Sequence, residues 1–387
     1  MQKCTKCHQV DGVIKAGFIR GNQRFFCKIC SQHFILENAF KSDLKKNGQS
    51  TITDVANALG VSISTVSRAL NDKSDINPDT KKAILQAAME LDYRPNLLAQ
   101  SLHKGKTNTI GVIIPDVEHP FFAKVLAGIQ QVANSSCFRI IVCHSNESKS
   151  AEILNTETLI DCRVDGLIIS HSKETTSFEH IKKIIDKGIP VVQFDRIITE
   201  LNTHNVMHQD YKGSFDLVEH LILQGCERIA IMSGPQEMYI CKQRLEGYKA
   251  AFQKYGREIN EEYIVHSNIA KKDCLDVFDY FMSLEYPPDG IFTILNRNGV
   301  EMMKIAKERG IRIPQEIAFA GFGDDILAEY FEPSLTVFNH FPPAIGQEVM
   351  KVLIRLIENK THFPAYNHFI EGELVVRQSS QKGGYIK

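Results

Sequence analysis

Two pairs of cysteines near the start of the chain carry the clearest chemical signal. They are Cys4-x-x-Cys7 and Cys27-x-x-Cys30, and nineteen residues lie between the pairs. Two pairs at this distance typically supply four thiolates to one tetrahedral zinc ion. A pair of redox dithiols is the other interpretation, but no thioredoxin-like βαβ pattern surrounds them. We therefore predict a structural Zn2+ bound by Cys4, Cys7, Cys27 and Cys30.

The segment around these cysteines has the layout of a zinc ribbon, which we place at residues 1–34. Val13-Ile14-Lys15 and Arg24-Phe25-Phe26 are expected to form short strands joined through glycine-containing turns. A segment of this length is too small for a hydrophobic core of its own, so we expect it to need the metal to fold. His8 and His33 lie beside the cysteine pairs and could replace a ligand, although four cysteines already complete the set.

The predicted ribbon is similar to the zinc ribbons that precede a helix-turn-helix in some insertion-sequence transposase proteins. The likeness rests on the cysteine pairs, on VIKAG and RGNQRFFCKIC, and on the closing Phe34. Its basic side chains favour nucleic acid modestly, and a protein partner or no partner at all stays open; these side chains are Lys3, Lys6, Lys15, Arg20, Arg24 and Lys28. Residues 35–50, with a charged middle and a polar end, are expected to be a short helix or a linker.

The stretch from Thr51 to Asn71 has the period of two short helices. Gly60 interrupts a three- and four-residue spacing of apolar residues, which are Val55, Ala56, Leu59, Val61, Val66, Ala69 and Leu70. Thr53 can cap the first helix and Ser62 the second. We predict a helix, a tight turn and a second helix, followed by a third helix that starts at Asn77-Pro78. An ordinary helical hairpin inside a larger core is the alternative for the first two helices.

From residue 107 onward, short apolar strands alternate with amphipathic helices. The β-branched runs are TIGVIIP, FRIIVCH, DGLIIS and PVVQF, followed by RIAIMSG, GIFTIL and EIAFAGF. Each run is separated from the next by a helical stretch. The alternation predicts a parallel sheet built twice, and therefore an α/β class with two doubly wound lobes.

From Thr51 to about Ser379 the chain resembles the LacI family of bacterial transcription regulators. The family's motifs occur in order as DVANALGVSISTVSRALN, YRPNLLAQSL, IGVIIPDVEHPFF, VDGLIIS, IPVVQFDR, RLEGY, IPQEIAFAGFGDD and ELVVRQSS. The resemblance implies a helix-turn-helix DNA-binding domain at 51–95, a hinge helix and linker at 96–106, a periplasmic-binding-protein-like core for effector binding and dimerisation at 107–379, and a tail at 380–387. A ribbon at 1–34 joined by a linker at 35–50 departs from the usual family plan.

The resemblance also implies how DNA is read. The second helix of the helix-turn-helix would enter the major groove of a palindromic operator bound by a homodimer. Ile63 and Ser64 occupy the positions that vary with the operator, and the apolar Ile63 would read a thymine methyl. Leu102 stands where the family inserts a leucine into the minor groove. The residues expected to contact DNA are Thr53, Ser62, Ile63, Ser64, Thr65, Ser67, Arg68, Asn71 and Leu102.

The family's ligand cleft would lie between the two lobes, lined by Phe121, Phe122, Ser170, Asp195, Arg244, Ile269 and Arg297. Ile269 stands in place of an aromatic ring, Leu295 in place of an asparagine, and Gly323 in place of the first aspartate of GFDD. These changes remove groups that hold neutral sugars, whereas Arg244 stays and Arg297 lies nearby in the sequence. We expect a small-molecule effector such as a sugar acid or phosphosugar, held by Arg244 in bidentate fashion. A cleft without a ligand is the alternative that stays open.

Composition and charge agree with a cytoplasmic DNA-binding protein. The chain has 387 residues, 43% of them apolar, and a net charge of −1. Residues 1–106 carry 16 Lys and Arg against 9 Asp and Glu, and the remainder carries 29 against 37. The basic end suits DNA phosphates, although an ordinary solvated surface can also carry such a surplus. Neither a signal peptide nor a run of about twenty apolar residues is present, so we expect no membrane partner, and thiols rather than disulfides for the ten cysteines.

Other classes of function fit less well. A solute-binding protein of a transporter would share the two-lobe fold, but it would need a signal peptide and would lack the helix-turn-helix. A transposase-like or recombination accessory protein is suggested by the ribbon, yet the large domain shows no nuclease-like carboxylate cluster. An enzyme is not expected, because the sequence has no P-loop, no GxSxG and no GxGxxG. We expect a LacI-type regulator, most simply a repressor, that carries an extra zinc ribbon.

Overall fold

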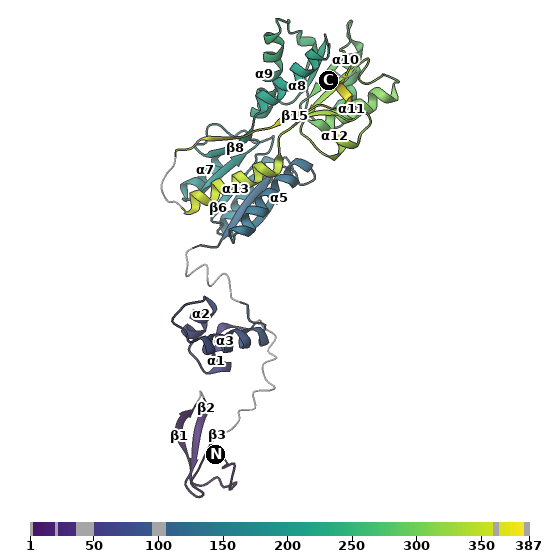
Figure 1. Cartoon of the computed structure of the whole chain (residues 1–387). Coiled ribbons are helices and arrows are strands. Elements are labelled where there is room, and N and C mark those ends of the chain that lie inside the picture. Colours follow the sequence, from purple (N-terminus) through teal and green to yellow (C-terminus); the bar gives the residue numbers. More distant parts are fainter. Residues whose placement is uncertain (1–2, 20–21, 36–49, 95–105, 359–363, 383–387) are drawn as a thin grey trace. The chain divides into compact units, whose positions relative to one another are not determined.

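The computed structural model describes residues 3–19, 22–35, 50–94, 106–358 and 364–382. Its contacts divide the chain into two compact units, Met1–Thr107 and Asn108–Lys387 (Figure 1). Most of the predicted linker at 35–50 and of the hinge segment at 96–106, including Leu102, lies outside the described residues.

A three-stranded antiparallel sheet forms the ribbon. β1 (Val13–Ile19) pairs with β2 (Asn22–Cys27), and β2 pairs with β3 (Gln32–Ile35). The rings of Phe25 and Phe34 stack with their centroids 5.8 Å apart and pack with the buried Cys4 and Cys27. Two aromatic rings and the cysteine side chains make up this core, so the ribbon has too little apolar surface to fold without a further crosslink.

Three helices form the helix-turn-helix domain. They are α1 (Ile52–Leu59), α2 (Ile63–Leu70) and α3 (Pro78–Glu90). Their shared core consists of small and β-branched side chains, which are Val55, Ala56, Val66, Ala69, Ile84, Ala87 and Ala88. Gly60 ends α1 with φ near +63°, a left-handed conformation that suits glycine and makes the tight turn between α1 and α2.

The caps of these helices match the sequence prediction at one position and differ at the other. Ser62 caps α2, since its hydroxyl accepts from the Thr65 N–H at 3.1 Å. Thr51, and not Thr53, caps α1: the Thr51 hydroxyl accepts from the Asp54 N–H, and the Asp54 carboxylate accepts from the Thr51 N–H at 2.8 Å. Because Thr51 and Asp54 bond to each other's backbone N–H groups, α1 begins directly after Thr51. Thr53 is therefore the second residue of the helix and not its cap.

The second unit contains two lobes, each built on a six-stranded sheet. The sheet of lobe 1 has the order β14-β8-β7-β6-β4-β5, and all its pairs are parallel. Its strands are β4 (Thr109–Ile114), β5 (Arg139–His144), β6 (Gly166–Ile169), β7 (Val191–Phe194), β8 (His204–His208) and β14 (Asn367–Ile370). Helices α5 (Pro120–Ser135) and α13 (Pro342–Glu358) cover one face, and α6 (Lys149–Asp161) and α7 (Glu179–Asp186) cover the other.

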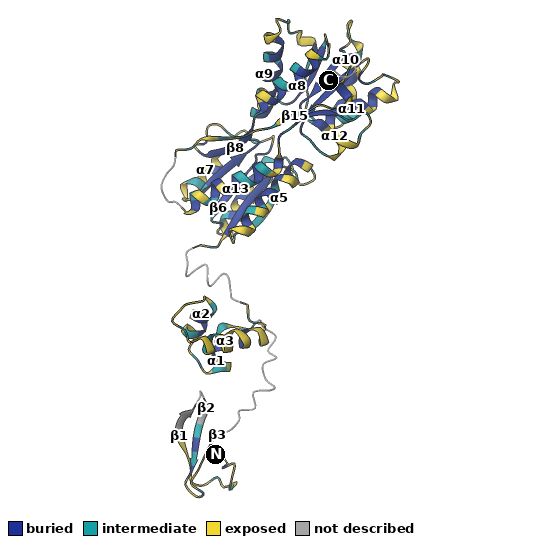
Figure 2. Cartoon of the chain, in the orientation of Figure 1, coloured by how far each residue is buried: buried dark blue, intermediate teal, exposed yellow. Residues whose placement is uncertain are grey.

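Lobe 2 repeats this plan with one antiparallel edge. Its order is β10-β9-β11-β12-β13-β15, and only the β13–β15 pair is antiparallel. The strands are β9 (Ile229–Ser233), β10 (Ile264–His266), β11 (Gly290–Thr293), β12 (Ala318–Phe322), β13 (Thr336–Asn339) and β15 (Glu373–Val375). α8 (Asp210–Leu223) and α9 (Tyr239–Lys254) cover one face; α10 (Asp273–Ser283), α11 (Asn296–Glu308) and α12 (Ile326–Tyr330) cover the other. Figure 2 shows the central strands of both lobes buried beneath helices whose outer faces are exposed.

The chain passes between the lobes more than once. β8 belongs to lobe 1 and α8 to lobe 2, so the first passage is at Gln209. Within the described residues, the chain returns at 340–341 and crosses again at 371–372. The segments that join the lobes therefore lie far apart in the sequence and meet between the sheets, where ligands bind in folds of this kind.

Glycines allow close helix packing in lobe 1. A Cβ on Gly128 of α5 would lie 2.1 Å from the carbonyl oxygen of Pro343, and one on Gly346 of α13 would lie 2.0 Å from that of Val125. The two helix backbones therefore approach each other closely at this crossing, and a side chain at either glycine would force them apart.

We expect Gly128→Ala to lower the free energy of unfolding of the second unit by about 2–3 kcal/mol, because the methyl group overpacks against backbone. This loss exceeds the roughly 1 kcal/mol that alanine gains over glycine in a helix. Urea unfolding of the full chain, followed by circular dichroism, measures the effect. Gly299→Ala is the comparison, since the nearest atoms to a Cβ there belong to side chains, Thr293 Oγ1 at 2.8 Å and Leu335 Cδ2 at 3.1 Å, and not to backbone, so a smaller loss is expected; equal stability losses for the two variants would contradict the prediction.

Candidate functional site

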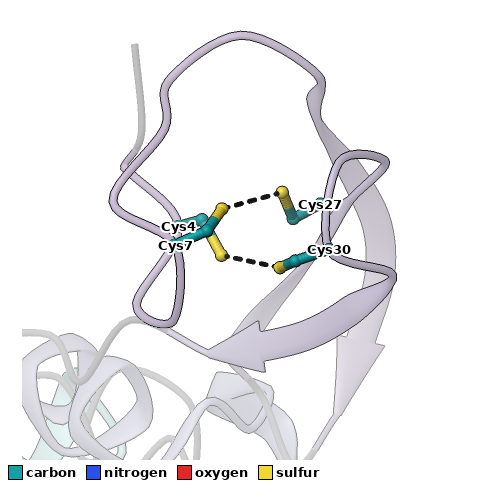
Figure 3. Close-up of side chains that lie close together, drawn as sticks. All are labelled: Cys4, Cys7, Cys27 and Cys30. Carbon is teal, nitrogen blue, oxygen red and sulfur yellow. Dashed lines mark hydrogen bonds between the residues drawn. The ribbon is translucent and has the colours of Figure 1, made fainter.

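The four cysteines predicted to bind zinc lie together at one end of the ribbon (Figure 3). The Cys4 and Cys30 sulfurs are 3.5 Å apart, and those of Cys7 and Cys27 are 3.6 Å apart. All four sulfurs lie within 4.8 Å of one another. Thiolates around a tetrahedral zinc ion stand roughly 3.8 Å apart, given a Zn–S distance of about 2.3 Å, so the donor set and its spacing fit the metal.

The backbone around Cys4 favours a thiolate at that residue. The backbone N–H of Cys7, followed by that of Lys6, lowers the pKa of the Cys4 thiol to about 6. Such N–H groups stabilise negative charge on sulfur and orient it, as outer hydrogen bonds do around metal sites.

The recognition helix α2 presents the residues expected to contact DNA. Ile63 is 48% exposed, Ser64 and Arg68 are exposed, and Thr65 and Ser67 are partly exposed. Thr53 on α1 and Asn71 at the end of α2 are exposed as well. Arg68 forms an ion pair with Asp75, and the Asn71 amide donates to the Ser67 carbonyl at 2.7 Å.

Hydrogen bonds and an ion pair determine which of these side chains are available to DNA. The Ser62 hydroxyl is used by the cap and by contacts with the Ser64 and Thr65 hydroxyls at 2.8 Å, which leaves Ile63 and Ser64 as the outward side chains at the start of α2. Arg68 would have to leave Asp75 or share it in order to reach DNA. An exposed pair of this kind is weak, so the exchange is inexpensive.

A cavity of about 230 Å³ lies between the two lobes of the second unit. Residues after the strands of lobe 1 and lobe 2 line it from opposite sides. Six of the seven side chains expected in the cleft are in this lining: Phe121, Phe122, Asp195, Arg244, Ile269 and Arg297. Ser170 is not; it is fully buried directly after β6.

Arg244 is already engaged at the base of the cavity. Its Nε donates to Asp210 Oδ1 at 2.8 Å, its Nη1 donates to the Ile294 carbonyl, and its guanidinium lies 3.7 Å from the centre of the Phe322 ring. Both Arg244 and Asp210 are nearly fully buried. Nε is therefore occupied and Nη1 uses one of its two N–H groups, so a bidentate grip through Nε does not fit, whereas the second N–H of Nη1 and both of Nη2 are left for a ligand.

Sequence analysis missed several polar residues of the lining. Asn296 and the buried His340 come from lobe 2 and from the passage between lobes, and Lys173 and Arg196 come from lobe 1. Arg196 forms an ion pair with Glu147 at 2.7 Å. Neither Lys173 nor Arg297 has an ion pair within the described residues. Their place in the lining was not visible in the sequence, because the loops after strands carry no periodic signal.

Burial and nearby charged groups shift the pKa values of two histidines of this cavity. Burial lowers the pKa of His119, and Arg297 and Arg196 lower it further. Burial also lowers the pKa of His340 well below its usual range, with additional contributions from His208 and Arg244. Asp195 and Asp116 raise the pKa of His119, but burial and the two arginines outweigh them, so the neutral form of both rings is favoured.

Comparison with known proteins identifies both units. Residues 51–96 match bacterial regulatory proteins of the lacI family, and residues 218–380 match the periplasmic binding protein-like domain. The ribose operon repressor of Halalkalibacterium halodurans is 32% identical over 334 residues, which cover 86% of this chain and 98% of that protein. The HTH-type transcriptional regulator RegA of Clostridium saccharobutylicum is 30% identical over 85% of this chain and 99% of RegA.

The chain belongs to the LacI family of bacterial transcription regulators. The Lac repressor dimer bound to operator and the anti-inducer ONPF has the same fold, with a TM-score of 0.77, 21% identity, and coverage of 86% of this chain and 99% of that one. The predicted α/β two-lobe fold, the helix-turn-helix and the function as a DNA-binding regulator rather than an enzyme are confirmed. None of the described helices has the length and apolar character needed to cross a membrane.

Gly323, one of this chain's departures from the LacI family pattern, has a structural explanation. Its φ is +95°, a conformation that a side chain disfavours, and a Cβ there would lie 3.2 Å from Cε1 of His340. The His340 ring, stacked on Phe121 with centroids 5.1 Å apart, occupies the space next to Gly323. The ring of His340, on the passage between the lobes, therefore fills the space next to Gly323, the position where the family pattern has an aspartate.

Buried neutral histidines make the stability of the second unit of this LacI-family chain depend on pH. Burial lowers the pKa of His119, His220, His340 and His368 below the ordinary value near 6.5. As pH falls through about 6.5 the unfolded chain takes up protons that the folded chain excludes, so stability is lost toward low pH. We expect the melting temperature of His340→Gln to fall less than that of the wild type between about pH 7.5 and about pH 5.5, because one histidine that resists protonation has been removed. Parallel curves for the variant and the wild type would contradict the prediction.

Proposed function

We propose that this LacI-family regulator is a repressor that binds a palindromic operator as a homodimer, and that an anionic sugar derivative in the cleft sets its affinity for DNA. Relatives named as repressors support the direction of regulation; they include the ribose operon repressor and the HTH-type transcriptional repressor PurR of Vibrio vulnificus. A related regulator from Enterococcus faecium has been solved with bound ribose, which supports a sugar-like effector.

Exposed apolar residues support a homodimer. The five-residue helix α12 exposes Ile326 (67%), Leu327 (53%) and Tyr330 (75%). Several large apolar side chains exposed on one short element are typical of a protein contact. A second copy is the partner that fits a regulator of palindromic sites, because the two-fold symmetry of the operator matches that of a dimer.

Two cations without an ion pair in the described part of the chain are the observation that carries the choice of an anionic effector. Lys173 on lobe 1 and Arg297 on lobe 2 line the cavity and have no carboxylate partner within the described residues. Five carboxylates line the cavity as well, and each has a partner within the protein: Glu147 pairs with Arg196, Asp324 accepts two bonds from Arg377 at 3.0 Å, Asp195 lies 3.0 Å from His208, and Asp116 and Asp325 accept from backbone N–H groups. A carboxylate or phosphate of a sugar acid or phosphosugar would therefore be held chiefly by Lys173 and Arg297, with Arg244 Nη2 as a further donor.

We expect Arg297→Ala to weaken binding of a sugar acid or phosphosugar about 10- to 100-fold, because a hydrogen bond to a charged group contributes roughly 1.5–3 kcal/mol. Isothermal titration with hexuronates, hexose phosphates and the matching neutral hexoses measures this. Arg309→Ala is the control, since Arg309 pairs with Asp279 and does not line the cavity. Micromolar binding of a neutral hexose, unchanged in Arg297→Ala, would refute the anionic effector. If no ligand binds at all, the alternative of a cleft without an effector holds.

The ribbon is proposed to hold one structural Zn2+ and to add a DNA contact beside the helix-turn-helix. Support comes from the four-sulfur cluster and from basic side chains that are exposed on the ribbon, namely Lys3, Lys6, Lys15 and Lys28. Positive side chains held on a rigid module release counterions from DNA phosphates and raise affinity without reading bases.

Operator selection from random DNA tests the ribbon. We expect the zinc-loaded wild type to select a palindromic site. The Cys4→Ser, Cys7→Ser variant should select the same central sequence, but bind the site more weakly and with a smaller dependence of affinity on salt concentration. Cys137→Ser, Cys162→Ser is the control, because both cysteines are exposed and lie outside the ribbon. Equal affinity of the two variants would show that the ribbon serves another partner. Failure to select any site would overturn the repressor function and favour a recombination accessory role.

A further inference from the structure

A second group of metal-ligating side chains lies inside lobe 1, apart from the ribbon and outside the lining of the cleft. Glu152 in the first turn of α6 is fully buried, and His171 after β6 and His180 on α7 are 3% and 5% exposed. The ligand atoms of these three residues lie within 4.8 Å of one another.

Both histidines converge on one oxygen of Glu152. Its Oε1 is 2.8 Å from His180 Nε2 and 3.0 Å from His171 Nδ1. The other oxygen, Oε2, accepts from the Ser172 N–H at 2.6 Å and from the Thr175 hydroxyl at 3.1 Å. Two helices and the loop after β6 therefore bring one carboxylate and two imidazoles to a single point.

The hydrogen bonds around Gln193 determine how His171 faces this point. Gln193 Nε2 donates to the Ile198 carbonyl, and Gln193 Oε1 accepts from the Ile198 N–H, so the amide can be oriented in one way only. Its Oε1 therefore accepts from His171 Nε2 at 2.8 Å, and that ring nitrogen carries the hydrogen. In a neutral His171 the lone pair of Nδ1 then faces the Glu152 carboxylate, an arrangement that requires a cation between them.

We propose that Glu152, His171 and His180 bind a divalent transition-metal ion such as Zn2+ within lobe 1. One carboxylate and two imidazoles are a common donor set for such ions. The bond from His171 Nε2 to Gln193 and those to Glu152 Oε2 are the outer contacts that orient metal ligands. Donors around zinc stand roughly 3.3 Å apart, so a few tenths of an ångström of side-chain movement admits the ion. A water molecule would complete four-coordination.

The ion would stabilise the loop that reaches the cleft. Lys173 follows Ser172 directly and lines the cavity, and its backbone N–H donates to Glu147. A metal that links α6, α7 and the loop after β6 holds the backbone of this loop in place. Loss of the ion would therefore loosen the loop and move Lys173, without removing any group that contacts the effector.

Metal stoichiometry of the full-length protein tests the proposal. We expect two zinc ions per wild-type chain, one in the variant whose four ribbon cysteines are serine, and one in His180→Phe. With cobalt, the cysteine-free ribbon variant is expected to bind one equivalent and to show no thiolate-to-cobalt charge-transfer band, since its ligands are nitrogen and oxygen. His220→Gln is the control: it removes a buried histidine that binds Ser380 elsewhere in the second unit, and it should retain two zinc ions.

The competing occupant is a proton, which would make His171 a buried imidazolium. One zinc ion in the wild type and none in the ribbon variant would overturn the proposal, and so would 15N NMR signals from His171 that show both nitrogens protonated and do not change with added zinc. Because the NMR measurement uses the wild type, the proposal stays testable even if His180→Phe does not fold.

Discussion

The buried ion pair between Arg244 and Asp210 is the interaction on which the arrangement of the cleft depends. Two charges removed from water are costly unless their remaining hydrogen-bonding groups are satisfied. Here Arg244 also donates to the Ile294 carbonyl and packs on Phe322, and Asp210 lies at the N-terminus of α8, where the helix dipole favours a carboxylate. The pair joins α8 to α9 and to the end of β11, so it holds the base of the cavity rigid.

Further contacts link the carboxylate of Asp210 to side chains of lobe 1. Asp195, at the end of β7 in lobe 1, lies 3.0 Å from His208, and His208 lies 3.8 Å from Asp210 in lobe 2. His208 also packs edge-on against His340, with ring centroids 4.8 Å apart. Polar side chains from two separate crossings of the chain therefore meet between the sheets. A change in the spacing of the lobes has to rearrange these contacts, which gives the cleft a defined set of positions rather than a continuous range.

Much of the fold was predictable because its signals are local. β-branched runs predicted seven strands of the second unit, which are β4, β5, β6, β7, β9, β11 and β12, and the period of Val55 to Leu70 predicted α1 and α2. β8, β13 and β14 were missed because they contain histidine, asparagine and threonine and lack a long apolar run, and β10 and β15 because each has only three residues. The Thr51 cap depends on its partner Asp54, which a search for single capping residues overlooks.

The site was less predictable, since its properties arise from contacts between distant segments. Six of the seven residues expected in the cleft line it. Ser170 is absent from the lining because it is the first of three buried residues after β6, with its side chain inside the lobe. The occupied donors of Arg244 follow from Asp210 and Ile294, which lie 34 and 50 residues away in the chain. No spacing in the sequence indicates such a contact, so a bidentate role could be neither deduced nor excluded from the residue type.

An effector can change DNA affinity only if it binds two states of the protein with different strength. A ligand that contacted one lobe alone would bind an open and a closed cleft almost equally, and would shift nothing however tightly it bound. Lys173 belongs to lobe 1 and Arg297 to lobe 2, and both line the same cavity. An anion held by both cations is sensitive to the distance between lobes, and each tenfold preference for one spacing adds about 1.4 kcal/mol to the coupling. The placement of two unpaired cations on opposite walls is therefore what would make this cleft a switch as well as a binding site.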